Sequence, residues 1–199
     1  MSVQFLGRMA GVAVLAMGLA ACVDVDIDVA LTSTTTARAT MTQTMNADLY
    51  SMVKMAEESG QSEEASFCEE GTLTENADGS ATCSIMEEGL FADLDLGQDE
   101  GGISFTDAGP GLVRIVLPTA DMTGELGIDD EMDEETKQMT LAFFEGHNIT
   151  VSFSGTEIVD TNMTRSADGK SASHVIPMAD LIEGTLDIPA ELFAVVRAP

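Results

Sequence analysis

The chain has 199 residues, 44% of them apolar, and its 35 acidic against 8 basic side chains give a formal net charge of −27. This length supports one domain with a proper core, and this apolar content is too high for a generically disordered chain. A surface this negative repels nucleic acid and anionic head groups, which excludes nucleic-acid binding, and it attracts cations or basic proteins.

The N-terminal segment at 1–21 has the features of an export signal. Arg8 lies in a short basic region, and the apolar run Met9–Leu19 has the length of a signal-peptide core. The run is well short of the roughly 20 residues that a membrane-spanning helix needs. The segment is therefore predicted to direct export, not to span the membrane.

The four residues at 19–22, "LAAC", resemble the lipobox of bacterial lipoproteins. The resemblance implies that Cys22 is lipidated and becomes the diacylated first residue of the mature chain. The alternative is an ordinary signal peptide cleaved near Ala21, which leaves Cys22 as a thiol. The expected product is one exported domain at 22–199, anchored in the bacterial cell envelope, on the periplasmic face of the outer membrane if the cell is Gram-negative. The mature chain lacks Arg8, so it has seven basic and 35 acidic residues and a net charge of about −28.

The next segment, 23–45, predicts a β-hairpin. In "VDVDIDVAL", apolar residues alternate with Asp24, Asp26 and Asp28, the pattern of a strand with one buried and one wet face. A polar turn at 32–36 leads into "ARATMTQTMN", a second alternating arm.

A helix is predicted directly after this hairpin. Asn46 offers an N-cap, and apolar residues recur with helical spacing at Leu49, Met52, Val53 and Ala56 before a glycine at position 60. This spacing places Met52 on the stripe that faces the core.

Two cysteines predict a disulfide within an acidic insertion at about 57–102. Three cysteines are an odd number for an exported protein, and assigning Cys22 to the lipid leaves Cys68 and Cys83. They flank two strand-like arms and turn-forming residues at 76–79. Closing a loop of about 15 residues is worth roughly 3 kcal/mol. The alternative is two unpaired, buried thiols.

The rest of the chain predicts an α+β fold. After an acidic, glycine-rich connector at about 86–102, strands are expected at 103–108, 112–118, 148–155, 156–164, 172–178 and 192–197, with a turn around 167–169. A second helix is expected from about Asp130 to Glu145. The predicted architecture is a single domain with a mainly antiparallel sheet, an N-terminal hairpin and two packed helices.

A lipobox cysteine that leads directly into the alternating segment 23–45, with "FSGTEIVDTNMTRSADGKSASHVIPMADL" at 153–181, resembles the LppM-like bacterial lipoprotein domain. In that family an N-terminal hairpin precedes a helix, and a late Phe-x-Gly turn opens a further hairpin. The resemblance implies a small α+β domain at the membrane surface with no assigned enzymatic activity. Ser154 stands where the family often has proline, and the C-terminal membrane segment of some members is absent.

No catalytic or cofactor-binding motif accompanies these features. The sequence contains two histidines, His147 and His174, and no nucleophile elbow, phosphate loop or zinc-protease motif, so no enzymatic activity and no cofactor are expected. A metal is not expected either. Alternate residues of a strand lie about 6.6 Å apart, too far for Asp24, Asp26 and Asp28 to share one calcium ion. The acidic run 129–135 lacks the glycine and terminal glutamate of an EF-hand. The thirteen methionines could suit copper(I), but methionine is also a common core filler.

Two functions from different classes remain. The first is a lipid-anchored, non-enzymatic domain at the membrane surface, with a structural or adaptor role and a basic protein as its partner. The alternative is a carrier or sensor that binds an apolar, lipid-like ligand in a groove between sheet and helices, lined by methionine and phenylalanine. A closed core favours the first function, and an empty apolar cavity favours the second.

Overall fold

The computed structural model describes residues 23–58, 67–69, 71–97, 102–119, 137–138, 141–142 and 144–199. The predicted signal at 1–21, the lipidation site Cys22 and most of the helix predicted for about 130–145 lie outside these residues. Of that helix, residues 137–138, 141–142 and 144 are described and are helical. Within the described ranges, no helix is long and apolar enough to cross a bilayer.

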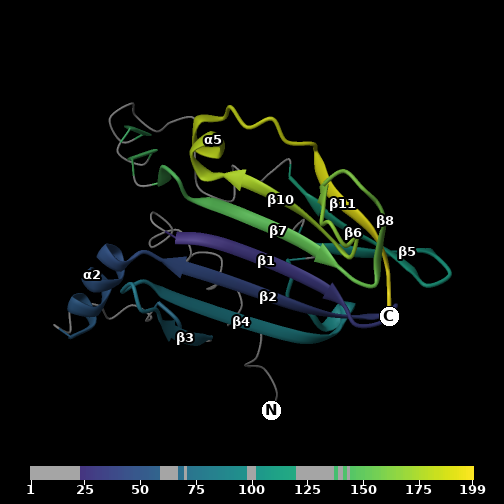
Figure 1. Ribbon diagram of the computed structural model, residues 1–199, viewed down its shortest axis with the longest axis horizontal. Helices are drawn as coiled ribbons and strands as arrows, with labels where there is room; N and C mark the ends of the chain where they lie inside the picture. The colour runs from purple at the N-terminus through teal and green to yellow at the C-terminus, as the bar shows by residue number, and fades with distance from the viewer. Residues whose placement is uncertain are drawn as a thin grey trace, which may run out of the picture.

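Most of the described chain forms two β-sheets (Figure 1). The larger sheet has seven strands in the order β3-β4-β2-β1-β7-β10-β9, and the smaller has four in the order β5-β6-β11-β8. The strands of the larger sheet are β1 (Val23–Leu31), β2 (Thr36–Met45), β3 (Thr72–Glu75), β4 (Ala81–Leu90), β7 (Asn148–Ser154), β9 (Thr164–Arg165) and β10 (Ser171–Pro177). Those of the smaller sheet are β5 (Ser104–Gly109), β6 (Leu112–Pro118), β8 (Glu157–Thr161) and β11 (Glu191–Arg197). The helices are α2 (Ala47–Glu58), the single-turn η2 (Phe91–Asp93) and α5 (Met178–Glu183).

The larger sheet is mixed, because β1 pairs antiparallel with β2 and parallel with β7. The smaller sheet is antiparallel in each of its pairings. The prediction of a mainly antiparallel sheet with two packed helices is therefore correct only in part. Period-2 patterns mark strands but do not specify their partners, and the six-residue α5 is too short to give a helical period.

The inward faces of the two sheets share one hydrophobic core. Alternation along β1 points Val29 and Leu31 inward, as the sequence pattern predicts. Phe153 on β7 and Ile115 on β6 are both fully buried in the same cluster. The core therefore lies between the sheets.

Helix α2 covers a second, smaller cluster at the start of β1. The Oδ1 atom of Asn46 accepts a hydrogen bond from the backbone N–H of Leu49 at 2.9 Å, which confirms the predicted N-cap. Tyr50 is buried in the cluster, and Leu49 and Val53 pack against it. Met52 is 65% exposed, so its predicted core position was wrong. The helix contacts the sheet through the adjacent stripe of side chains, which includes Tyr50.

The chain passes from the larger to the smaller sheet at Gly155, between β7 and β8. A Cβ atom there would lie 2.5 Å from Cγ1 of Val196 and 2.7 Å from the backbone oxygen of Arg197, so only glycine fits without displacement. Strand β8 then pairs with β11. The turn predicted around 167–169 is present, but it joins the short β9 to β10.

Part of the segment predicted as an insertion, at about 57–102, belongs to the larger sheet. Its strand β4 pairs with β2 along the whole length of both strands, from Met45 opposite Ala81 to Thr36 opposite Leu90. The pairing extends β4 into residues that the sequence pattern assigned to a connector at about 86–102. Glycine and glutamate have a low strand propensity, but the hydrogen bonds to a full-length partner strand stabilise β4 at these residues.

Candidate functional site

The predicted disulfide between Cys68 and Cys83 is present, with the two Cα atoms 5.5 Å apart. Cys83 is buried on β4, and Cys68 follows Phe67, whose ring contacts the Tyr50 ring edge-on at a centroid distance of 6.4 Å. The disulfide therefore ties residues 67–69 to the larger sheet beside α2. Gly71 fits against it closely, because a Cβ atom there would lie 2.7 Å from the Sγ atom of Cys83.

The outward face of the larger sheet is rich in hydroxyl groups. The pairing registers place Asp24, Asp26 and Asp28 of β1 opposite Thr44, Thr42 and Thr40 of β2. Further hydroxyl residues on this face are Thr82, Ser84, Thr150, Ser152, Ser154, Ser171 and Ser173. The predicted wet face of the hairpin thus continues across the sheet.

The three aspartates of β1 lie in a row along the outward face of the strand. Their side chains share one face of the strand, at the alternate positions that the sequence pattern indicated. Within the described ranges no group of three or more His, Cys, Asp or Glu residues is arranged to hold a metal ion. The Nδ1 atom of His147 lies 3.5 Å from Oδ1 of Asp24, which accepts a hydrogen bond from the backbone N–H of Asn148. This contact ties the start of β7 to β1.

Burial perturbs the carboxyl group of Asp28 in this row. Desolvation raises the pKa of its carboxyl above the usual value, so the folded state disfavours the charged form. We expect Asp28→Asn to raise the midpoint of thermal unfolding slightly at neutral pH. The gain should shrink as the pH falls through the pKa of Asp28 in the folded protein, because the wild-type carboxyl is then protonated. Asp26→Asn, at an exposed position of the same strand, is the control. Equal effects of both substitutions would contradict the role of burial.

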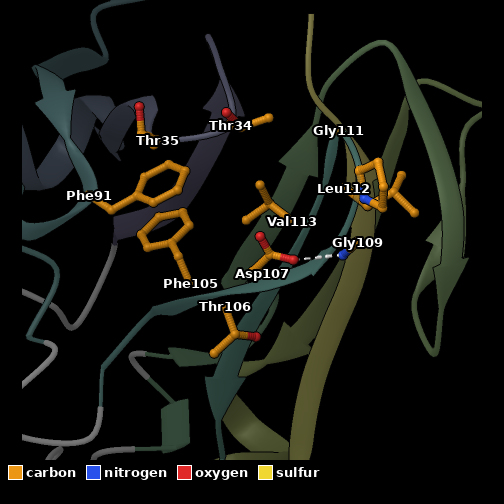
Figure 2. A pocket seen from close by; sticks show the side chains of 11 residues that line it. Thr34, Thr35, Phe91, Phe105, Thr106, Asp107, Gly109, Gly111, Leu112 and Val113 are labelled. Carbon is orange, nitrogen blue, oxygen red and sulfur yellow. Dashed lines mark hydrogen bonds between the residues drawn. The ribbon is translucent and has the colours of Figure 1, made fainter.

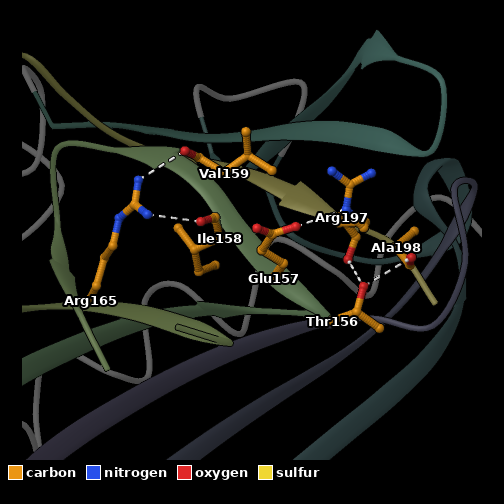
Figure 3. Close-up of polar contacts among 7 residues, drawn as sticks. All are labelled: Thr156, Glu157, Ile158, Val159, Arg165, Arg197 and Ala198. Atoms are coloured by element: carbon orange, nitrogen blue, oxygen red, sulfur yellow. Dashed lines mark hydrogen bonds and ion pairs between the residues drawn. The ribbon is translucent and has the colours of Figure 1, made fainter. Parts of the chain in front are cut away.

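The basic side chains of the domain are largely engaged with its own surface. Ion pairs join Arg38 to Glu88, Lys54 to Glu75, Arg114 to Glu191 and Arg197 to Glu157. Arg165 donates to the backbone oxygens of Ile158 and Val159, which tethers β9 to β8 (Figure 3). Exposed pairs of this kind contribute little stability. Because acidic residues far outnumber basic ones, most carboxylates of the described chain lack a basic partner within it.

A cleft of about 560 Å³ opens at the end of the two sheets (Figure 2). Three segments form it: the β1–β2 turn, the start of η2 and the β5–β6 hairpin. The rings of Phe91 and Phe105 stack at a centroid distance of 4.1 Å and an interplanar angle of 4°. The backbone N–H of Phe91 donates to the oxygen of Thr35, which fixes η2 to the β1–β2 turn.

The tip of the β5–β6 hairpin forms the wall opposite the two rings. Gly109 and Gly111 have φ angles of +116° and +73°, which side chains with a Cβ rarely adopt, so the tight turn around Pro110 depends on them. The Oδ1 atom of Asp107 accepts a hydrogen bond from the N–H of Gly109 at 2.8 Å. Asp107 is the one titratable residue among the described residues that line the cleft, with Val113 and Leu112 as apolar neighbours.

The cleft differs from the groove expected for an apolar ligand. Its described lining contains phenylalanine, as predicted, and the hydroxyl residues Thr34, Thr35 and Thr106, but no methionine. It lies between loops at the ends of two sheets and not between sheet and helices. Sequence reasoning did not assign Phe91, Phe105 or Asp107 to a site. The Gly-Pro-Gly turn at 109–111 was the available signal, because it indicates a rigid hairpin tip.

No family model and no curated protein matches this chain. Among solved structures, the chain is similar to the folded domain of the LppM protein of Mycobacterium tuberculosis, determined by NMR. The two share 8% sequence identity with a TM-score of 0.44, over 88% of this chain and 90% of that one. The likeness is a distant structural one.

Proposed function

We propose that this chain is a lipid-anchored, non-enzymatic binding domain of the bacterial cell envelope. In this proposal Cys22 carries the lipid, and the cleft at the end of the two sheets is the binding site. From the sequence pattern, we place the lipid anchor in the outer membrane, on its periplasmic face, if the cell is Gram-negative.

The observation that carries the proposal is the position of β1. The strand begins at Val23, the residue after Cys22, and Val23 is buried and pairs with Met45. No linker therefore separates the proposed anchor from the folded domain. A strand of nine residues spans about 26 Å, and the cleft lies at its other end, beside the β1–β2 turn. The domain would thus hold its cleft away from the lipid.

The composition of the cleft favours binding over catalysis. General acid–base chemistry uses positioned titratable groups, often in pairs, whereas the described part of the cleft wall carries one such group, Asp107. An apolar floor with a few polar groups at its rim is typical of a recognition site.

Native mass spectrometry of the protein extracted from its own membrane tests the proposal. We expect the mass of a chain that begins at Cys22, increased by a diacylglyceryl group and any further acyl chain. A chain of unmodified mass, or one that begins at another residue, would contradict lipid anchoring. A retained apolar small molecule would instead support the carrier function.

A further inference from the structure

We propose that the cleft beside the β1–β2 turn binds the guanidinium group of an arginine presented by a basic protein partner. This inference rests on the proposed function and names the chemistry of its ligand.

The aromatic wall of the cleft suits a delocalised cation. Phe91 and Phe105 are half-buried and stacked in parallel, which holds both rings in one orientation. A guanidinium group near an aromatic ring is attracted by the ring quadrupole and also stacks on it as a planar group. Lysine lacks this planar contact and is more strongly hydrated.

The carboxylate of Asp107 supplies the opposite charge. Its Oδ1 atom is oriented by the N–H of Gly109, and Figure 2 shows the other carboxylate oxygen on the side of Val113. An oriented carboxylate beside an apolar floor can accept charge-assisted hydrogen bonds from the N–H groups of arginine. Thr34 at the rim provides a further oxygen acceptor.

The charge distribution points to a cation from outside the chain. Among the described residues that line the cleft there is no basic side chain. From Met55 to Val113 the sequence contains fifteen acidic residues and no lysine or arginine. The arginines at 38, 114, 165 and 197 already contact carboxylates or backbone oxygens of the domain. Asp107 is the one carboxylate among the described lining residues, whereas calcium takes six to eight oxygen ligands.

The test measures peptide binding to the lipidated full chain in nanodiscs of zwitterionic lipid. One probe is an acetylated and amidated peptide of glycine and alanine with a single central arginine. The matched probe has citrulline, the neutral counterpart of arginine, at that position. We expect the arginine peptide to bind about tenfold more tightly or better, since cation–π contact and charge-assisted hydrogen bonding require the positive charge.

Two variants locate the site. Asp107→Asn keeps an oxygen that can accept from Gly109, and it should reduce the affinity for the arginine peptide about tenfold without changing that for the citrulline peptide. Phe105→Leu should weaken binding of the arginine peptide. The control Asp187→Asn removes the same charge at an exposed position outside the cleft, and should leave the affinity unchanged.

The outcomes separate this inference from the proposed function. Equal losses in Asp107→Asn and Asp187→Asn would show attraction by the overall negative charge, and would overturn the arginine site. Equal affinity for both peptides, lost in Phe105→Leu, would keep the cleft as a binding site but overturn its preference for arginine. Absence of binding by either peptide at millimolar concentration would overturn the arginine site, whereas lipid anchoring would still be judged by the native mass.

Discussion

Cys22→Ser is expected to move the protein from the membrane fraction to the soluble exported fraction. Each buried methylene of an acyl chain contributes about 0.8 kcal/mol to membrane binding, and two chains give stable anchoring where one is marginal. Removing the thiol removes the proposed attachment point for both chains. The remaining domain has a net charge of about −28 and is repelled by anionic head groups.

Fractionation of cells followed by immunoblotting measures this change. Ala21→Gly is the matched control, because it keeps a small residue before the cysteine and should leave the protein in the membrane fraction. Wild-type protein that is already soluble, or a Cys22→Ser variant that stays in the membrane, would refute lipidation at this residue.

Replacing both Cys68 and Cys83 by alanine is expected to lower the free energy of unfolding by about 3 kcal/mol, the value for a closed loop of about 15 residues. The structure supports an effect of this size, because Cys83 is buried and the link holds residues 67–69 against the sheet and Tyr50. Part of the loss is expected to appear as faster hydrogen exchange in α2, whose cluster contacts Phe67.

Urea unfolding of the soluble Cys22→Ser form, with and without the double substitution, measures the difference. Using this form keeps lipid and detergent out of the comparison, and leaves no third thiol to form wrong pairs. An unchanged unfolding midpoint and slope would mean that the disulfide adds nothing to stability.

Local features of the fold were predictable from the sequence where one segment carried the whole signal. The alternation in β1, the cap at Asn46 and the turn before β4 each depend on neighbouring residues, and the structure confirms them. Strand pairing depends on distant residues. The parallel contact of β1 with β7 and the passage between sheets at Gly155 therefore left no periodic signal.

The cleft could not be predicted for the same reason. Phe91 follows β4, Phe105 lies in β5, and Thr35 belongs to the first hairpin, so their meeting depends on how two sheets pack. Met52 illustrates the opposite error. Its helical spacing was correct, but spacing alone cannot say which of two adjacent apolar stripes faces the sheet.

The central claim is that the domain sits directly on its lipid anchor with the cleft at the far end of β1. Spin labels on single added cysteines at Asp48 and Thr34, both exposed, test this in lipid nanodiscs that carry a lipid-bound relaxation agent. Asp48 lies in the first turn of α2, the helix whose Tyr50 shares a buried cluster with Val23, and Thr34 lies at the rim of the cleft. The account predicts strong broadening of the label at Asp48 and none at Thr34. Negligible broadening at both positions would mean that the first residues form a linker, and strong broadening at both would place the cleft against the membrane; either result would contradict the account.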